Sequence, residues 1–276
     1  MKFPEVNISK VILVCCNFVF LGCGVALVCF GGLLLTDEHR VLLSRLAGPN
    51  HPLPHPMFYY LSLGMMSTGL LCCAIGILGC WASCGRSVCL FGLYLFLLVV
   101  LLLGESTLGA LVAVCPQYLG IGMSSSQLLE VLQHNYGVPG QEQVTAALDL
   151  TQTKMECCGI NNAQDYGTSW WHLKELGQRD LQVPLSCCLT NKTIDNPRAF
   201  LDPQPANITL CQAPQEDMFI KGRYTDGCLE KLQEWFRQQI AIFLAMSLTL
   251  VLVELSALLS AILACVREPR LDLRTL

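Results

Sequence analysis

Four long stretches of almost uninterrupted apolar residues divide the chain, at residues 11–35, 57–81, 88–112 and 240–266. Each is long enough for an α-helix to cross the hydrocarbon core of a bilayer, which needs about 20 residues. Between them lie a small loop at 36–56, a turn at 82–87 and a long loop at 113–239, with tails at 1–10 and 267–276. The first stretch lacks a small-residue cleavage site, so we expect an uncleaved helix rather than a secretory signal. The pattern predicts an all-α membrane protein with four transmembrane helices.

Composition agrees with this class. Hydrophobic residues make up 53% of the 276 and charged residues only 14%, and the mean hydropathy is +0.50, a balance that soluble domains seldom show. The net charge of -4 carries little information. Because no basic patch alternates with aromatic residues, we expect no nucleic-acid partner.

The short polar segments predict the orientation of the spans. Their basic residues gather on the side of the two tails and the turn, and this side is expected to be cytoplasmic. These residues are Lys2, Lys10, Arg86, Arg267, Arg270 and Arg274. The opposite side then holds both loops, together with the sequons that begin at Asn191 and Asn207, which are expected to be glycosylated. We expect a multi-pass protein of the plasma membrane or an endosomal membrane, with both termini cytoplasmic.

The long loop has the pattern of an ordered domain. Ser124 to Ser126 can cap an amphipathic helix that carries Leu128, Leu129 and Leu132 and stops near Gly137. A second amphipathic helix should end at Cys157. Residues 161–221 are broken by Asn, Pro, Gly and Asp, so we expect irregular structure with short helices there. A last helix, from about Thr225, should run directly into the fourth span.

Six cysteines cluster in this loop and indicate disulfides on the oxidising side of a membrane. Residues alone leave about 15 pairings open. Adjacent cysteines bridge each other only with strain, so neighbours should have different partners. A zinc site is disfavoured because adjacent cysteines lack the gap that lets two sulfurs bind one metal, and no metal is expected elsewhere. The six are Cys157, Cys158, Cys187, Cys188, Cys211 and Cys228.

The chain resembles the tetraspanin family over nearly its whole length. The resemblance is carried by four spans with a small first and a large second outer loop, by Cys157-Cys158-Gly159 after an amphipathic helix, by Pro184-Leu185-Ser186-Cys187, and by Gly227-Cys228 before the last span. It implies a disulfide-stapled extracellular loop of the six-cysteine type. The implied pairs are Cys157–Cys228, Cys158–Cys187 and Cys188–Cys211.

One amide and two carboxyl side chains lie inside the spans: Asn17, Glu105 and Glu254. A carboxyl group in hydrocarbon is costly, so each should face the bundle interior. We favour hydrogen bonding between helices, or the lining of a lipid pocket, over a proton or ion path, because no embedded Lys, Arg or His completes a relay. The resemblance implies a sterol pocket that holds cholesterol, and we expect no other cofactor.

Small residues recur at heptad spacing in the first two spans and predict that these two helices pack closely on each other. They are Asn17, Gly24 and Gly31 in the first span and Ser62, Gly69 and Gly76 in the second. Cysteines also gather at the cytoplasmic membrane face, where S-acylation acts, and palmitoylation is expected at Cys80, Cys84, Cys89 and Cys265. Cys115, at the outer end of the third span, is expected to be a free, buried thiol.

No phosphate-binding loop or catalytic triad pattern is present, and the cytoplasmic parts are short, so we expect a non-enzymatic membrane scaffold. It would bind other membrane proteins laterally; the resemblance implies integrins, receptors, proteases or other tetraspanins as partners. The binding region is expected within residues 159–227, with Trp170, Trp171, Phe200 and Phe219 as exposed anchors or, for half of them, core residues. The alternatives are a four-span channel or transporter that uses Glu105 and Glu254, and a membrane thiol oxidoreductase.

Overall fold

The computed structural model describes residues 8–47, 54–84, 88–114, 124–177, 180–190 and 198–272. The chain forms two compact units. The first, here called the bundle, comprises residues 1–36, 60–114 and 241–276; the second, the head, comprises 37–59 and 115–240. The predictions for Asn191 and Cys115 lie outside the described residues, as do the side chains of Cys84 and Cys265.

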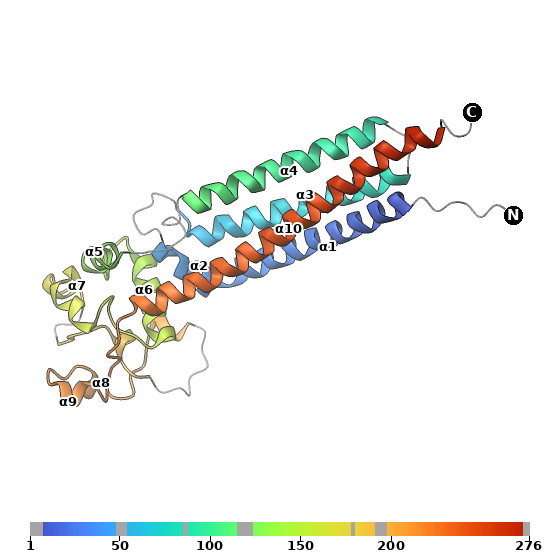
Figure 1. Cartoon of the computed structure of the whole chain (residues 1–276). Helices are drawn as coiled ribbons and strands as arrows, with labels where there is room; N and C mark the ends of the chain where they lie inside the picture. Colours follow the sequence, from blue (N-terminus) through green and yellow to red (C-terminus); the bar gives the residue numbers. More distant parts are fainter. Residues whose placement is uncertain are drawn as a thin grey trace. The chain divides into compact units, whose positions relative to one another are not determined.

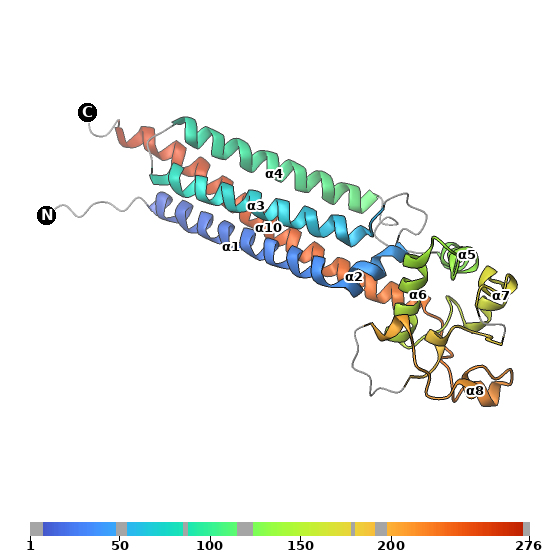
Figure 2. The same ribbon diagram turned by 180° about the vertical axis from the view of Figure 1, so that it is seen from behind.

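The bundle contains long helices that run side by side, as both Figure 1 and Figure 2 show. They are α1 (Ile8–Thr36), α3 (Met57–Cys84), α4 (Val88–Val114) and the membrane-embedded part of α10 (Leu229–Asp272). All four are long and apolar enough to cross a membrane. The four predicted spans are therefore confirmed, and the last helix does run without a break into the fourth span.

Close contact between α1 and α3 follows from the stripe of small residues. A Cβ placed on Gly24 would lie 2.8 Å from the carbonyl oxygen of Gly69, and a Cβ on Gly69 would lie 2.7 Å from the carbonyl oxygen of Gly24. At Gly76 it would lie 3.2 Å from the carbonyl oxygen of Asn17. Only residues without a bulky side chain permit this approach, so the predicted pairing of the first two spans is confirmed.

The bundle is apolar inside and outside. Its buried core includes Leu13, Phe20, Cys72, Ile75, Tyr94 and Leu98. Large apolar side chains also cover the outer surface, among them Phe18, Leu70 and Phe96, which are each more than 60% exposed. An apolar outer surface of this kind is suited to lipid rather than water.

The head begins with the two helices that the sequence predicts. Helix α5 (Ser125–Asn135) starts where the Ser124 side chain accepts a hydrogen bond from the Gln127 N–H, and it buries Leu128 and Leu132. Helix α6 (Glu142–Met155) ends at Glu156, which adopts the left-handed conformation with φ of 53°. The Cys157 N–H then bonds back to the Gln152 carbonyl, a common way to end a helix.

The small loop belongs to the head, a feature that its sequence does not reveal. It folds into α2 (Glu38–Leu43) and the 3-10 turn η1 (Ser44–Ala47), and both contact α6. Leu43 packs with Leu150 and Phe200 in one buried cluster. Residues that are far apart in the chain thus form one core.

The remainder of the head is irregular, as predicted, and consists of short helical pieces joined by turns. These are η3 (Ala163–Thr168), α7 (Trp170–Leu173), η4 (Leu185–Cys187), η5 (Ala199–Leu201), α8 (Ile208–Cys211) and α9 (Glu216–Phe219). Two isolated bridges, Cys188 with Arg223 and Thr190 with Pro205, take the place of a sheet in the described part of the head.

Candidate functional site

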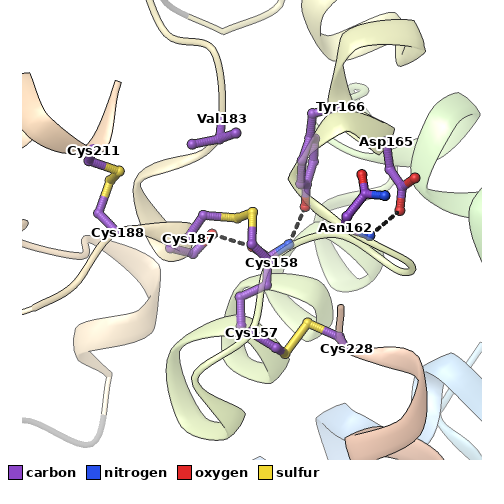
Figure 3. The surroundings of a disulfide bond; sticks show 12 residues. Cys157, Cys158, Asn162, Asp165, Tyr166, Val183, Cys187, Cys188, Cys211 and Cys228 are labelled. Atoms are coloured by element: carbon purple, nitrogen blue, oxygen red, sulfur yellow. Dashed lines mark hydrogen bonds between the residues drawn. A yellow bond between two sulfur atoms is a disulfide. The ribbon is translucent and has the colours of Figure 1, made fainter. Parts of the chain in front are cut away.

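Three disulfides hold the irregular part of the head. They join Cys157 to Cys228, Cys158 to Cys187 and Cys188 to Cys211. These are the three disulfides that the family resemblance implies. Figure 3 shows that Cys157 and Cys158, which are neighbours in the chain, bond to different partners, as do Cys187 and Cys188. All six cysteines are at most 1% exposed. Buried disulfides of this kind are structural. Cys157–Cys228 ties the end of α6 to the start of α10, and the other two hold η4 and α8.

The corner after Cys158 depends on Gly159 and Asp165. Gly159 has φ of 70°, and a Cβ there would overlap the carbonyl oxygen of Asn162. The Asp165 carboxylate accepts hydrogen bonds from the N–H groups of Ile160, Asn161 and Asn162 at 2.7–3.3 Å. The chain therefore makes a tight, fully hydrogen-bonded turn here, at which helix α6 gives way to the irregular segment (Figure 3).

Trp171 forms the aromatic core of this segment. Its ring meets those of Tyr136 and Tyr166 edge to face, with centroids 5.9 and 5.8 Å away. Gly137 and Gly177 both approach the ring so closely that a Cβ on either would lie 2.5 Å from it. The expectation that Trp171 is an exposed anchor is therefore wrong, because only 8% of the residue is exposed.

Phe200 is also a core residue, with 7% exposure and contacts to Leu43 and Leu150. Trp170, by contrast, is 36% exposed. Lys174 covers its ring face with the ammonium 3.5 Å from the centroid, and the His134 ring meets it edge to face. Phe219 is partly exposed and carries the Arg223 guanidinium 3.7 Å from its ring centroid. Trp170 and Phe219 thus remain candidate anchors.

A buried polar network joins α6 to the segment Pro184-Leu185-Ser186-Cys187. It was not identified from the sequence. Asp149 Oδ1 accepts hydrogen bonds from the Tyr136 and Ser186 hydroxyls at 2.7 and 2.6 Å. Ser186 also lies 2.6 Å from Gln152 Oε1, and Gln152 bonds to Tyr166. Burial raises the pKa of Asp149 to about 6, although both hydroxyl donors oppose the change. The sequence feature that could have indicated this network is Ser186, the polar residue of Pro184-Leu185-Ser186-Cys187.

The head also exposes large apolar side chains along the region from Gly159 to Gly227. Leu173 and Leu201 are 64% and 58% exposed, and Leu176, Ile208, Met218 and Ile220 are between 39% and 51% exposed. Of these residues, Ile208 stands on α8, which the Cys188–Cys211 disulfide holds in place. Such a surface suits contact with another protein better than contact with water.

In the bundle, the three polar residues do not form one cluster of hydrogen bonds. Asn17 accepts a hydrogen bond from the Tyr94 hydroxyl at 2.9 Å and donates to the Leu13 carbonyl at 2.9 Å. Glu254 is 1% exposed, and neither of its carboxyl oxygens has a hydrogen-bond partner in the described part of the chain; the same holds for Glu105 Oε2. Tyr94, the partner of Asn17, was not identified from the sequence.

The proposed modification sites are placed as follows. Asn207 is exposed and caps α8, where its Oδ1 accepts from the Leu210 N–H at 3.0 Å. Its amide nitrogen, the atom that carries an N-glycan, is left for modification. Cys80 lies partly buried on α3, and Cys89 is exposed near the start of α4.

Within the described ranges, no group of His, Cys, Asp and Glu residues is arranged to hold a metal ion. The six cysteines in the described part of the head are all in disulfides, which leaves none of these six as a free nucleophile.

Comparison with known proteins agrees with this geometry. A family model described as Tetraspanin family matches residues 9–267. The CD82 antigen of Homo sapiens is 24% identical over 267 residues, which cover 94% of this chain and 93% of that protein. The CD151 antigen of Chlorocebus aethiops is 36% identical over 127 residues, or 46% of this chain and 49% of that one. The leukocyte antigen CD37 of Rattus norvegicus is 26% identical over 283 residues, or 94% and 92%.

Proposed function

Because this chain belongs to the tetraspanin family, we propose that it binds particular membrane proteins laterally and gathers them into microdomains, which changes their trafficking, adhesion or signalling. A membrane scaffold role in general follows from the family. Tetraspanins are generally non-enzymatic, and the family assignment does not favour the channel or transporter alternative. The partners proposed are integrins, receptors, proteases or other tetraspanins.

One observation carries the proposal: exposed apolar side chains stand on a rigid, disulfide-stapled frame. The three disulfides remove freedom from the unfolded chain and hold short elements that could not be stable alone. Leu173, Leu201 and Ile220 remain more than half exposed on that frame. A preorganised apolar surface loses little conformational entropy when a partner binds, which favours specific recognition.

The proposal includes orientation and modification. Both termini would be cytoplasmic, in the plasma membrane or an endosomal membrane, and the head would lie on the opposite side. N-glycans on Asn191 and Asn207, and acyl chains on Cys80, Cys84, Cys89 and Cys265, would complete the molecule. Acyl chains at one membrane face would strengthen lateral clustering.

We also propose that the bundle binds cholesterol. The two carboxyl groups of Glu105 and Glu254 supply the polar atoms, because both retain oxygens without partners in the described bundle. A sterol hydroxyl could donate to one of these oxygens, whereas Asn17 is already engaged by Tyr94 and Leu13. Labelling with a photoreactive cholesterol analogue should fall in Glu254→Leu and persist in Leu108→Val, a lipid-facing control; equal labelling would exclude this site.

The scaffold proposal is tested by purifying the full chain in a mild detergent and identifying the bound proteins by mass spectrometry. A chimera with residues 159–227 taken from another tetraspanin of the six-cysteine type serves as the comparison. We expect the dominant partner to be lost from the chimera, while resistance of its six loop cysteines to alkylation without reductant reports an intact head. Survival of the same dominant partner in a folded chimera would show that this region is not the binding site.

A further inference from the structure

The guanidinium group of Arg223 has no counter-ion among the described residues. None of their ion pairs includes it, and its Nε is buried without a hydrogen-bond partner. Among the described residues, the guanidinium packs over the Phe219 ring, with its carbon 3.7 Å from the ring centroid. Glu216 and Asp217 lie on the adjacent helix α9 but do not pair with it.

An unpaired, partly buried cation is unfavourable. Loss of water from a charged group costs free energy unless hydrogen bonds or an opposite charge replace it. Burial lowers the pKa of the Arg223 guanidinium below its ordinary value, which reflects this cost, but an arginine stays protonated at neutral pH. The ring of Phe219 offsets part of the cost, and the guanidinium Nε still has no hydrogen-bond partner among the described residues.

The backbone around Arg223 is fixed on both sides. Gly222 accepts a hydrogen bond from the Leu189 N–H, and Tyr224 donates one to the Cys187 carbonyl, both at 2.9 Å. Arg223 itself bridges to Cys188, whose disulfide holds the end of α8. The side chain therefore projects from an anchored segment, and little order has to be created when a ligand arrives.

Exposed apolar residues lie next to Phe219 in the chain. Met218 and Ile220, on either side of Phe219 in the chain, are 39% and 51% exposed. We call these four residues, Met218, Phe219, Ile220 and Arg223, the Arg223 surface. It combines one unsatisfied guanidinium with exposed hydrocarbon.

We propose that the Arg223 surface binds an Asp or Glu side chain of a protein partner, with apolar partner residues beside that carboxylate resting on Met218 and Ile220. The planar guanidinium would donate two parallel hydrogen bonds to the carboxylate oxygens. This inference rests on the proposed scaffold function and states which part of the head recognises the partner, and by what chemistry.

The charge balance of the segment favours a single carboxylate over an anionic membrane. Residues 216–223 carry Glu216 and Asp217 against Lys221 and Arg223, so their formal charges cancel. Attraction to an anionic lipid surface requires a cluster of basic residues, and this segment does not supply one. A direct, close contact with one carboxylate does not depend on a net positive field.

The first test selects peptides from a random dodecapeptide display library on the full chain in phosphatidylcholine nanodiscs. Binders that also recognise Arg223→Gln are removed. We expect the remaining sequences to contain Asp or Glu beside apolar residues. Recovery of no Arg223-dependent binder, or of binders without an acidic residue, would overturn the proposal.

The second test measures the affinity of one selected peptide and of its Glu→Gln or Asp→Asn counterpart. Arg223→Gln should weaken binding of the acidic peptide roughly 10- to 100-fold, the range for hydrogen bonds between charged groups. It should leave the neutral peptide nearly unchanged. Lys221→Gln, with the same change of net charge, is the matched control and should alter affinity less than about threefold. Equal losses in the two variants, or for the two peptides, would refute a specific carboxylate contact.

Further controls distinguish a carboxylate contact from misfolding and from lipid binding. Unchanged resistance of the six loop cysteines to alkylation shows that Arg223→Gln is folded. Arg223→Met keeps a side chain over Phe219 without the charge, and it should behave like Arg223→Gln. Binding to phosphatidylserine vesicles that depends on Arg223, without acidic-peptide binding, would assign the surface to lipid and overturn the proposal. If the chimera of residues 159–227 loses its partner while Arg223→Gln keeps it, the scaffold function stands and only this inference fails.

Discussion

Asp149 should make the stability of the head depend on pH. Its pKa in the folded chain is about 6, against an ordinary value of 3.8, because burial of the carboxylate outweighs the two hydroxyl donors. The protonated acid is therefore favoured by folding. Its contribution to stability is fully present below about pH 4, decreases as the pH rises through about 6, and is absent above that.

The size of this effect follows from linkage. The whole pKa difference of about 2 corresponds to on the order of 3 kcal/mol, an upper limit because Asp149 is partly exposed. Between about pH 4.5 and pH 7.5 the expected loss is about 2 kcal/mol. For a domain of this size, that is roughly a 4–8 °C change in the midpoint of thermal unfolding.

The assay compares the full chain with Asp149→Asn in detergent, by tryptophan fluorescence during heating at both pH values. Trp171 packs against Tyr136, the hydroxyl partner of Asp149, so it reports on this region. Other titrating groups are common to both proteins, and only the difference in midpoint is used. We expect the wild type to lose stability relative to Asp149→Asn as the pH rises. A constant difference would mean that the hydroxyl donors balance burial, and a difference of opposite sign that they outweigh it; either result would refute the reasoning.

Two glycine substitutions test the packing of the two units. Gly79→Ala should destabilise the bundle by about 1–3 kcal/mol, because its Cβ would overlap the Asn17 side chain and disturb the hydrogen bond to Tyr94. Thermal unfolding in detergent measures this loss. Gly92→Ala, with open space around its Cβ, is the control. Gly159→Ala should prevent correct disulfide formation, because φ is positive and its Cβ would overlap the Asn162 carbonyl. Alkylation without reductant measures the free thiols. The control is Gly167→Ala, whose Cβ meets nothing within 4 Å. An equally small number of free thiols in the two variants would contradict the prediction.

Much of the fold could be predicted because it depends on local chemistry. A run of apolar residues forms a helix across a bilayer wherever it occurs, and a serine before a helix can satisfy its free N–H groups, as Ser124 does. The Gly24 and Gly69 contact was also predictable, because small residues at heptad spacing permit helices to approach. The disulfide pairs were available only through the family resemblance, since residues alone leave about 15 pairings.

The candidate site was less predictable, because burial depends on distant partners. Trp170 and Trp171 are adjacent and chemically identical, yet one remains exposed and the other fills the space between Tyr136 and Tyr166. Phe200 is buried because the small loop brings Leu43 to it from far away in the chain.

By itself, the sequence determined the number of spans, the start of α5, the close approach of α1 and α3, and the presence of a stapled head. Only the tertiary structure decided which aromatic residues are available to a partner and that Asn17 meets Tyr94. It also decided that Asp149 is buried against Ser186 and that Arg223 lies over Phe219 with no counter-ion among the described residues. The physical reason is that spans and caps are fixed by the free energy of residues near one another in the chain. Exposure, pairing and pKa are fixed by the environment that distant segments create when they pack.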